Sequence, residues 1–122
     1  NIVLRLNPKL APIKAAVFPI VKREDMEKIA EDIVKDLSQE WNIDYDLGGS
    51  IGRRYSRQDE IGTPMCITVD GDSVEKKDVT IRERDSGEQI RVKIVDLKNI
   101  LRKLIDGEDF FKMGKLVDTR KK

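Results

Sequence analysis

One amphipathic segment, residues 26–41, restricts the fold of this chain more than any other feature. Its apolar side chains recur at the spacing of a helix that buries one face. They are Met26, Ile29, Ala30, Ile33, Val34, Leu37 and Trp41. The first turn is acidic, which suits the positive end of a helix dipole. The helix therefore requires an apolar surface on which to pack.

Apolar segments on both sides of this helix predict that surface. Residues 15–21, with the sequence AAVFPIV, are typical of a buried strand, and a short second strand is predicted at residues 43–46. A strand, a helix and a strand in this order have the proportions of a βαβ unit, whose two strands are parallel. The chain is thus predicted to be an α/β domain.

The remaining elements follow from turn signals and alternation. A glycine-rich turn at residues 47–52 precedes a short helix that Ser50 caps and that ends at residues 62–64. Residues 65–70 are a third apolar strand, residues 70–77 a turn and a charged loop, and residues 79–84 and 89–94 two alternating strands. A last helix has apolar residues from Leu97 to Ile105 on one face and ends near Gly107, and no regular period follows from Phe110 on. The predicted order is β-α-β-α-β-β-β-α, with a mixed sheet covered by helices.

The predicted pairing of the two alternating strands places two arginines opposite each other. A two-residue loop at positions 86 and 87 sets Val79 opposite Ile94 and puts the apolar side chains on one face. The same register sets Arg82 opposite Arg91, and like charges directly across a ladder are destabilising. We therefore expect this pair to extend into water or to bind an anion, and we expect Arg82→Ala to leave the fold intact or slightly more stable.

Composition excludes several kinds of chemistry. The 122 residues include no histidine, which removes imidazole acid–base catalysis and the commonest metal ligand. A single cysteine, Cys66, supports neither a disulfide within the chain nor a structural zinc site, and favours a reducing, cytoplasmic compartment. Cys66 itself is interpreted as a small core residue. No apolar stretch approaches the roughly 20 residues of a membrane span, and the first residue, Asn1, suggests a piece of a longer protein.

The net charge of +1 conceals a segregation of charge. Residues 1–23 contain five basic and no acidic residues, and residues 112–122 contain five basic residues and one acidic residue. Residues 24–111 contain 14 basic and 22 acidic residues. We interpret the basic ends as solvated. A polyanion would therefore have to bind a local basic surface of the central part.

The densest polar cluster follows the glycine-rich turn. It comprises Arg53, Arg54, Tyr55, Arg57, Gln58, Asp59 and Glu60. Its three arginines can bind phosphates bidentately and stack on bases, and a surface network of arginines and carboxylates is an equally consistent interpretation. The turn is either structural or an anion site built from backbone N–H groups. It lacks a complete phosphate-binding motif, which disfavours a small nucleotide-binding enzyme.

Three segments within residues 10–104 are distinctive, namely LAPIKAAVFPIV, DYDLGGSIGRRYSRQDEIGTPMCITVD and VTIRERDSGEQIRV. Through these segments most of the chain closely resembles the C-terminal anticodon-binding domain of glycyl-tRNA synthetase. The resemblance is to the class II, single-chain type also found in archaea and eukaryotes. It implies a three-layer α/β/α domain with a five-stranded mixed sheet at residues 10–106. Residues 1–9 would be a connector from an upstream catalytic domain, and residues 107–122 a basic C-terminal tail.

The resemblance also implies a function. Such a domain binds the anticodon stem-loop of glycine tRNA and helps to read its cytosines, while the catalytic domain of the parent glycine-tRNA ligase uses ATP and Mg²⁺. The domain alone is expected to be non-catalytic, without cofactor, metal or membrane contact. The parent is expected to be a cytoplasmic homodimer, and the isolated domain is compatible with a monomer. The alternative is a synthetase-derived accessory or protein-interaction module without ligase activity.

The family places RNA-facing polar residues on the short helix and on the hairpin. In this chain they are Arg53, Arg54, Tyr55, Arg57, Asp59, Glu60, Arg82, Glu83, Arg84 and Asp85. Carboxylates accept hydrogen bonds from the amino group of cytosine, whereas arginine binds phosphate and stacks. We expect base-edge contacts from Arg57, Asp59, Glu60 and Arg84. Three residues depart from the family's pattern, since Ser56 replaces a basic residue, Met65 an aromatic residue and Gly71 a phenylalanine.

Overall fold

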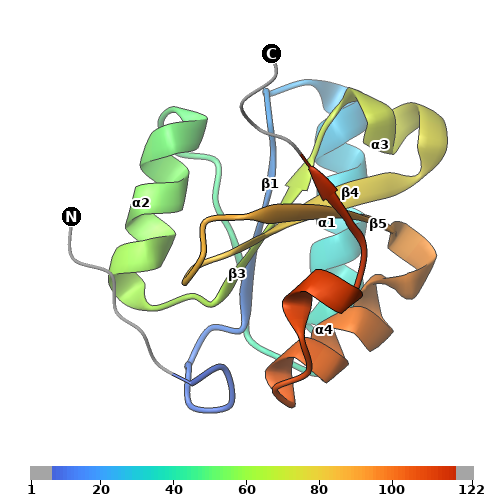
Figure 1. Ribbon diagram of the computed structural model, residues 1–122. Coiled ribbons are helices and arrows are strands. Elements are labelled where there is room, and N and C mark those ends of the chain that lie inside the picture. Colours follow the sequence, from blue (N-terminus) through green and yellow to red (C-terminus); the bar gives the residue numbers. More distant parts are fainter. Residues whose placement is uncertain (1–6, 118–122) are drawn as a thin grey trace.

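The structure is a computed structural model that describes residues 7–117. A mixed sheet of six strands forms its centre (Figure 1). The strands are β1 (Ala15–Pro19), β2 (Ile43–Tyr45), β3 (Met65–Val69), β4 (Asp78–Glu83), β5 (Gln89–Lys93) and β6 (Lys115–Val117). Their spatial order is β2-β1-β3-β4-β5-β6. Strand β1 pairs in parallel with both β2 and β3, as a βαβ unit requires, and the other pairs are antiparallel. The predicted βαβ unit is therefore confirmed.

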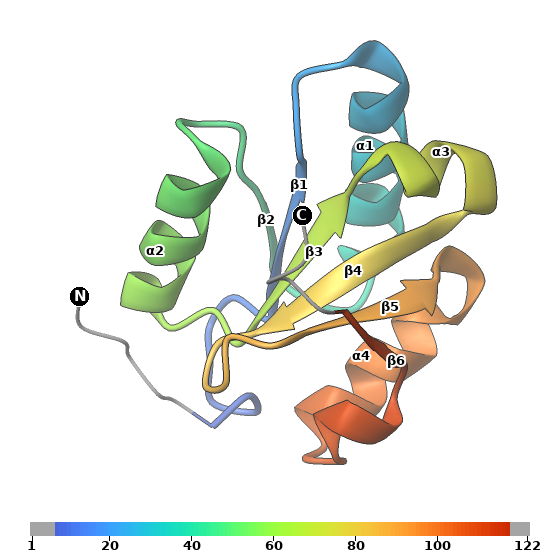
Figure 2. The same ribbon diagram turned by 45° about the horizontal axis from the view of Figure 1, so that its top comes forward.

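Helices cover the sheet on both faces. They are α1 (Glu24–Leu37), α2 (Ile51–Ile61), α3 (Gly71–Lys76) and α4 (Leu97–Ile105), with 3₁₀ turns at Ile94–Asp96 and Phe110–Lys112. Figure 2 shows α2 on one face and α1 and α4 on the other. The predicted three-layer α/β/α architecture is confirmed, with six strands in place of the expected five.

Strand β1 separates two apolar cores because its side chains alternate between the faces of the sheet. Val17 lies in the main core with α1 and α4. Phe18 lies in a smaller core with Cys66, against which Ile51 and Tyr55 of α2 pack. Burial raises the pKa of the Cys66 thiol to about 12, in agreement with its interpretation as a core residue. The small size of the second core leaves most of α2 for polar contacts.

The end of α1 differs from the prediction. The helix ends at Leu37, so Trp41 is not part of it. Short bonds of the i→i+3 kind from the N–H groups of Gln39 and Glu40 close the last turn. Trp41 still packs against the main core, and the Arg102 guanidinium lies 5.6 Å from its ring.

The register of the β4–β5 hairpin differs from the predicted one by two residues. Val79 pairs with Val92, and Arg82 pairs with Gln89, so the expected opposition of Arg82 and Arg91 is wrong. Residues 84–88 connect the two strands, and the N–H of Arg84 leaves the ladder and donates to the carbonyl of Pro64 at 2.9 Å. An even shift keeps the apolar side chains on one face.

Two elements were not expected. The predicted turn and charged loop after β3 contains helix α3, which begins with a capping box between Asp70 and Ser73. The predicted absence of regular structure from Phe110 on is also wrong, since β6 pairs with β5 there. Phe110 is only 3% exposed and fastens this segment to the main core. Residues 1–6 of the predicted connector and 118–122 of the predicted tail lie outside the described residues.

Candidate functional site

Helix α2 carries the polar cluster, and its ends are built as the sequence predicts. The Oγ of Ser50 accepts from the N–H of Arg53 at 3.3 Å, which caps the first turn. Gly49 and Gly62 flank the helix with φ angles of 76° and 83°, in the left-handed region that favours glycine. Tyr55 faces the sheet, where its ring lies edge-on to Phe18 at 5.4 Å.

On the β2 side of α2, an acidic pair holds two side chains of the helix. Arg57 donates to Asp46 from Nε at 2.9 Å and from Nη2 at 2.6 Å, and Nη2 also donates to the carbonyl of Gly48 at 2.7 Å. Gln58 donates from Nε2 to Asp46 at 3.1 Å and to Asp44 at 2.8 Å. Of the two interpretations of the polar cluster, the network of arginines and carboxylates is therefore observed at Arg57.

On the β4 side, Arg82 closes a second network. Its guanidinium donates to both carboxylate oxygens of Asp59, at 3.0 and 3.2 Å, and lies 4.9 Å from the centre of the Tyr55 ring. The Tyr55 hydroxyl is 3.0 Å from Oγ1 of Thr68. The side chains of Arg82 and Asp59 are only 17% and 12% exposed. Both oxygens of Asp59 are thus engaged inside the protein.

Two further arginines of the predicted site are buried. Arg54 donates from Nη1 to the carbonyl of Pro19 at 2.7 Å and lies 5.1 Å from the Phe18 ring. Arg84 donates from Nη1 to the carbonyl of Gly62 at 2.9 Å and from Nε to Asp85 at 2.8 Å. Each is 5% exposed, so each contributes mainly to holding α2 and its following turn on the sheet.

The rest of the predicted set is open to solvent. Arg53 and Glu60 are exposed on the outer face of α2, and Arg57 is exposed along one edge. In the hairpin loop Asp85 is exposed, and half-buried Glu83 accepts from the Ser86 hydroxyl at 2.7 Å. The predicted residues therefore divide into an internal group that fixes α2 and an outer group that meets the solvent.

Asp44 and Asp46 are polar residues of this region that the sequence reasoning missed. Asp44 lies in β2 and Asp46 directly follows that strand, two positions on, so their side chains point to the same face, which is the face that α2 covers. That spacing was the available signal. Burial would raise the pKa of the Asp46 carboxyl, but hydrogen bonds from Arg57 and Gln58 outweigh burial and lower this pKa below its ordinary value.

This lowered pKa predicts a pH dependence of stability. The folded state binds its proton at Asp46 less readily than the unfolded state, so the contribution is present above the ordinary pKa of 3.8 and is lost as the pH falls through the folded pKa. We expect Asp46→Asn to lower the free energy of unfolding by about 1–2 kcal/mol at pH 7. Urea unfolding at pH 7 and pH 3 should show a smaller pH effect in the variant. An identical pH effect in both proteins would contradict this role of Asp46.

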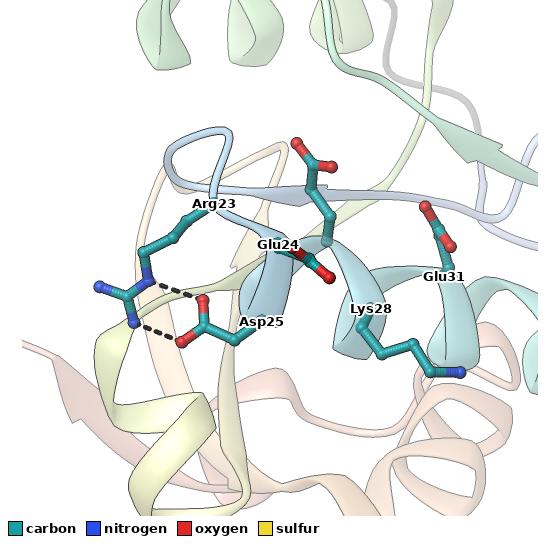
Figure 3. Close-up of a pocket in the computed structure, with 6 residues that line it drawn as sticks. Arg23, Glu24, Asp25, Lys28 and Glu31 are labelled. Atoms are coloured by element: carbon teal, nitrogen blue, oxygen red, sulfur yellow. Dashed lines mark hydrogen bonds and ion pairs between the residues drawn. The ribbon is translucent and has the colours of Figure 1, made fainter.

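A hollow lies at the start of α1, on the face of the sheet opposite to α2 (Figure 3). Arg23 is bound to Asp25 there at 2.6 Å, while Glu24, Lys28 and Glu31 line the rest. Its surplus of carboxylates disfavours a polyanion. Within residues 7–117, no group of three or more Cys, Asp or Glu side chains is placed to hold a metal ion. None of the described helices is long and apolar enough to cross a membrane.

Comparison with known proteins identifies the family. The model of a family described as "Anticodon binding domain" matches residues 14–104. The chain is 59% identical over 95 residues to a glycine--tRNA ligase of Rhodopirellula baltica, which covers 78% of this chain and 18% of that protein. It is 50% identical over 107 residues to the glycine--tRNA ligase of Corynebacterium glutamicum, covering 88% and 23%. The corresponding enzyme of Clostridium acetobutylicum is 54% identical over 105 residues, covering 86% and 22%.

The chain spans about a fifth of the length of these curated relatives. The part that matches contains the whole βαβ unit, α2 and the β4–β5 hairpin. The resemblance that the sequence motifs indicate is confirmed at this level. The chain belongs to the anticodon-binding domain family, in the form that occurs in glycine--tRNA ligases.

Proposed function

We propose that this domain binds the anticodon stem-loop of glycine tRNA as part of a longer glycine--tRNA ligase, and thereby supports attachment of glycine to that tRNA. Family membership and the names of the relatives support the proposal. The observation on which the proposal mainly rests is that α2 has an inner side, bonded to the sheet, and an outer side that faces the solvent. Its inner polar residues are fixed by the sheet, which holds Arg53, Arg57 and Glu60 ready on the outer side.

The chemistry of the outer side suits a single-stranded RNA loop. The guanidinium groups of Arg53 and Arg57 can bind phosphates and stack on splayed bases, and the Glu60 carboxylate can accept from the amino group of a cytosine. Among the residues expected to contact base edges, Arg57 and Glu60 are accessible, whereas Asp59 and Arg84 are engaged internally. We therefore assign direct reading to Arg57 and Glu60, and support of the surface to Asp59 and Arg84.

A titration with labelled RNA tests the proposal. The 122-residue chain is titrated, by fluorescence anisotropy, into a glycine anticodon stem-loop and into the same stem-loop with its anticodon cytosines replaced by uracils. We expect about fivefold weaker binding of the second RNA, because the Glu60 carboxylate loses an amino donor. The affinity should fall with salt, with a slope of about 0.7 for each single-strand phosphate contacted.

Glu60→Gln supplies the matched control for base reading. It is expected to narrow the difference between the two RNAs and to leave the salt slope unchanged, because Glu60 is exposed and contacts no phosphate in this proposal. Equal affinity of the unmodified protein for both RNAs would refute a reading role. Failure to bind either RNA would refute the proposed function as a whole.

We further propose that the parent is a class II, single-chain, homodimeric enzyme of the cytoplasm, whose catalytic domain uses ATP and Mg²⁺. The relatives named above are bacterial proteins about four times as long as this chain, which leaves room for such a domain. In this proposal residues 1–9 connect to that domain, residues 10–106 bind the tRNA and residues 107–122 follow. Disrupted class II motifs in the parent reading frame would indicate the accessory module instead.

A further inference from the structure

We propose that Asp46 and Gln58 are positioning residues that hold Arg57 in the orientation in which it contacts RNA. The inference rests on the proposed function and deepens it, because it explains how a long and flexible side chain becomes a defined recognition group. Neither residue belongs to the set that the family pattern indicates.

The first step concerns the bonds of Arg57 itself. Asp46 binds the edge of the guanidinium formed by Nε and Nη2, and the carbonyl of Gly48 takes the second N–H of Nη2. Within the described residues, Nη1 has no hydrogen-bond partner. The Arg57 side chain is 46% exposed, whereas that of Asp46 is 8% exposed. The guanidinium is therefore fixed along its inner edge and open along its outer edge.

The second step concerns the support of Asp46. Gln58 is completely buried, and its amide donates one N–H to Asp46 and the other to Asp44. Its Oε1 accepts from the Thr63 hydroxyl at 2.7 Å, which fixes the orientation of the amide. The reverse orientation would place Oε1 against two carboxylates. Gln58 thus holds Asp46 by a neutral donor, so that Arg57 remains the cation that neutralises it.

The third step concerns the space around the guanidinium. A Cβ at position 48 would lie 3.4 Å from Nη2 of Arg57 and 3.8 Å from Oδ1 of Asp46. Both are ordinary van der Waals distances, so the guanidinium lies directly against the turn, which limits the space into which it can move. Contacts with the turn, with the residue after β2 and with α2 thus restrict the Arg57 side chain before RNA binds. Little conformational entropy of this side chain is then lost on binding.

The effect of Asp46→Asn on RNA affinity distinguishes a positioning role of Asp46 from simple electrostatics, because the two predict changes in opposite directions. Asp46→Asn removes a negative charge close to the proposed RNA surface, and Coulomb repulsion alone would make RNA binding tighter. If Asp46 positions Arg57, the same substitution releases a side chain that RNA must then immobilise. Binding then weakens by about fivefold. The salt slope stays the same, because Arg57 keeps its charge.

The experiment is a double-mutant cycle on the 122-residue chain with the glycine anticodon stem-loop as the probe. We expect Arg57→Ala to weaken binding roughly tenfold and to reduce the salt slope. In that background Asp46→Asn should have no further effect within about twofold, because the residue that it positions is absent. Gln58→Met should behave like Asp46→Asn, and Arg57→Lys should lower affinity at an unchanged slope. Circular dichroism and urea unfolding verify that each variant is folded at the assay temperature.

Glu40→Gln is the matched control, since both oxygens of the Glu40 carboxylate accept from Nη2 of Arg102 on the far side of the sheet. It should not change RNA affinity. Tighter binding by Asp46→Asn, or an equal loss in the presence and absence of Arg57, would overturn the inference while leaving the proposed function in place. If the unmodified chain does not bind the stem-loop at all, the proposed function itself fails.

Discussion

Arg82→Ala is expected to lower the free energy of unfolding by about 3 kcal/mol, because it leaves the buried Asp59 carboxylate without its cation. The substitution also removes a cation–π contact with Tyr55. This expectation reverses the one that the sequence alone suggests, since the predicted repulsion with Arg91 does not exist. Arg91 has its own carboxylates, Asp70 at 2.6 Å and Asp78 at 2.7 Å. Urea unfolding followed by circular dichroism measures the loss.

Arg102→Ala provides the matched control for this prediction. Arg102 donates to both oxygens of one carboxylate, from Nη2, and lies over one aromatic ring, yet its side chain is 45% exposed and that of Glu40 is 37% exposed. We expect a clearly smaller loss than for Arg82→Ala, because solvent screens exposed pairs. Equal losses for the two variants would show that burial does not determine the strength of the Arg82–Asp59 pair.

Gly114→Ala is expected to cost about 2–3 kcal/mol, through a clash with the neighbouring strand. An added Cβ would lie 2.7 Å from the carbonyl oxygen of Arg91 and 2.7 Å from Cγ1 of Val92. Both atoms belong to β5, which is held on its other side by β4, so β6 has to move away. Hydrogen exchange should then become faster at amides of Gln89–Lys93 that bond to β6, in addition to the loss measured by urea unfolding.

Gly52→Ala is the corresponding control within a helix. A Cβ at this position meets nothing within 4 Å, and alanine favours a helix over glycine. We expect a gain of about 0.5 kcal/mol. A loss in this variant, or unchanged exchange in β5 of Gly114→Ala, would contradict the steric account of these two glycines.

The main architecture was predictable because its signals are local. The apolar period of α1, the buried run of β1 and the cap at Ser50 each lie within a few residues of one another. The hairpin register was not predictable in this way, because Arg84 is drawn out of the ladder by carbonyl groups 20 residues and more away in the sequence. Helix α3 has six residues, too few for a periodic signal, and β6 depends on the burial of Phe110.

In the candidate site, too, local features were predictable from the sequence, whereas contacts between distant segments were not. The sequence identified α2 as the place where arginines gather, and the structure puts Arg53 and Glu60 on its outer face. It did not indicate which arginines are structural, because the partners of Arg54 and Arg84 are backbone carbonyls of distant segments. Asp46 was missed because its alternate spacing with Asp44 does not reveal the partners of the two carboxylates, which are Arg57 and Gln58 of a later helix.

The two-sided helix α2 has a consequence for altering specificity. Each inner polar residue has a partner on the sheet or in a neighbouring loop, so a substitution there demands a compensating change elsewhere. Positions 53 and 60 have no hydrogen-bonded side-chain partner within residues 7–117, so they can be varied without disturbing that framework. A combinatorial library confined to these two positions would therefore vary the outer surface of α2 and leave the inner hydrogen bonds in place.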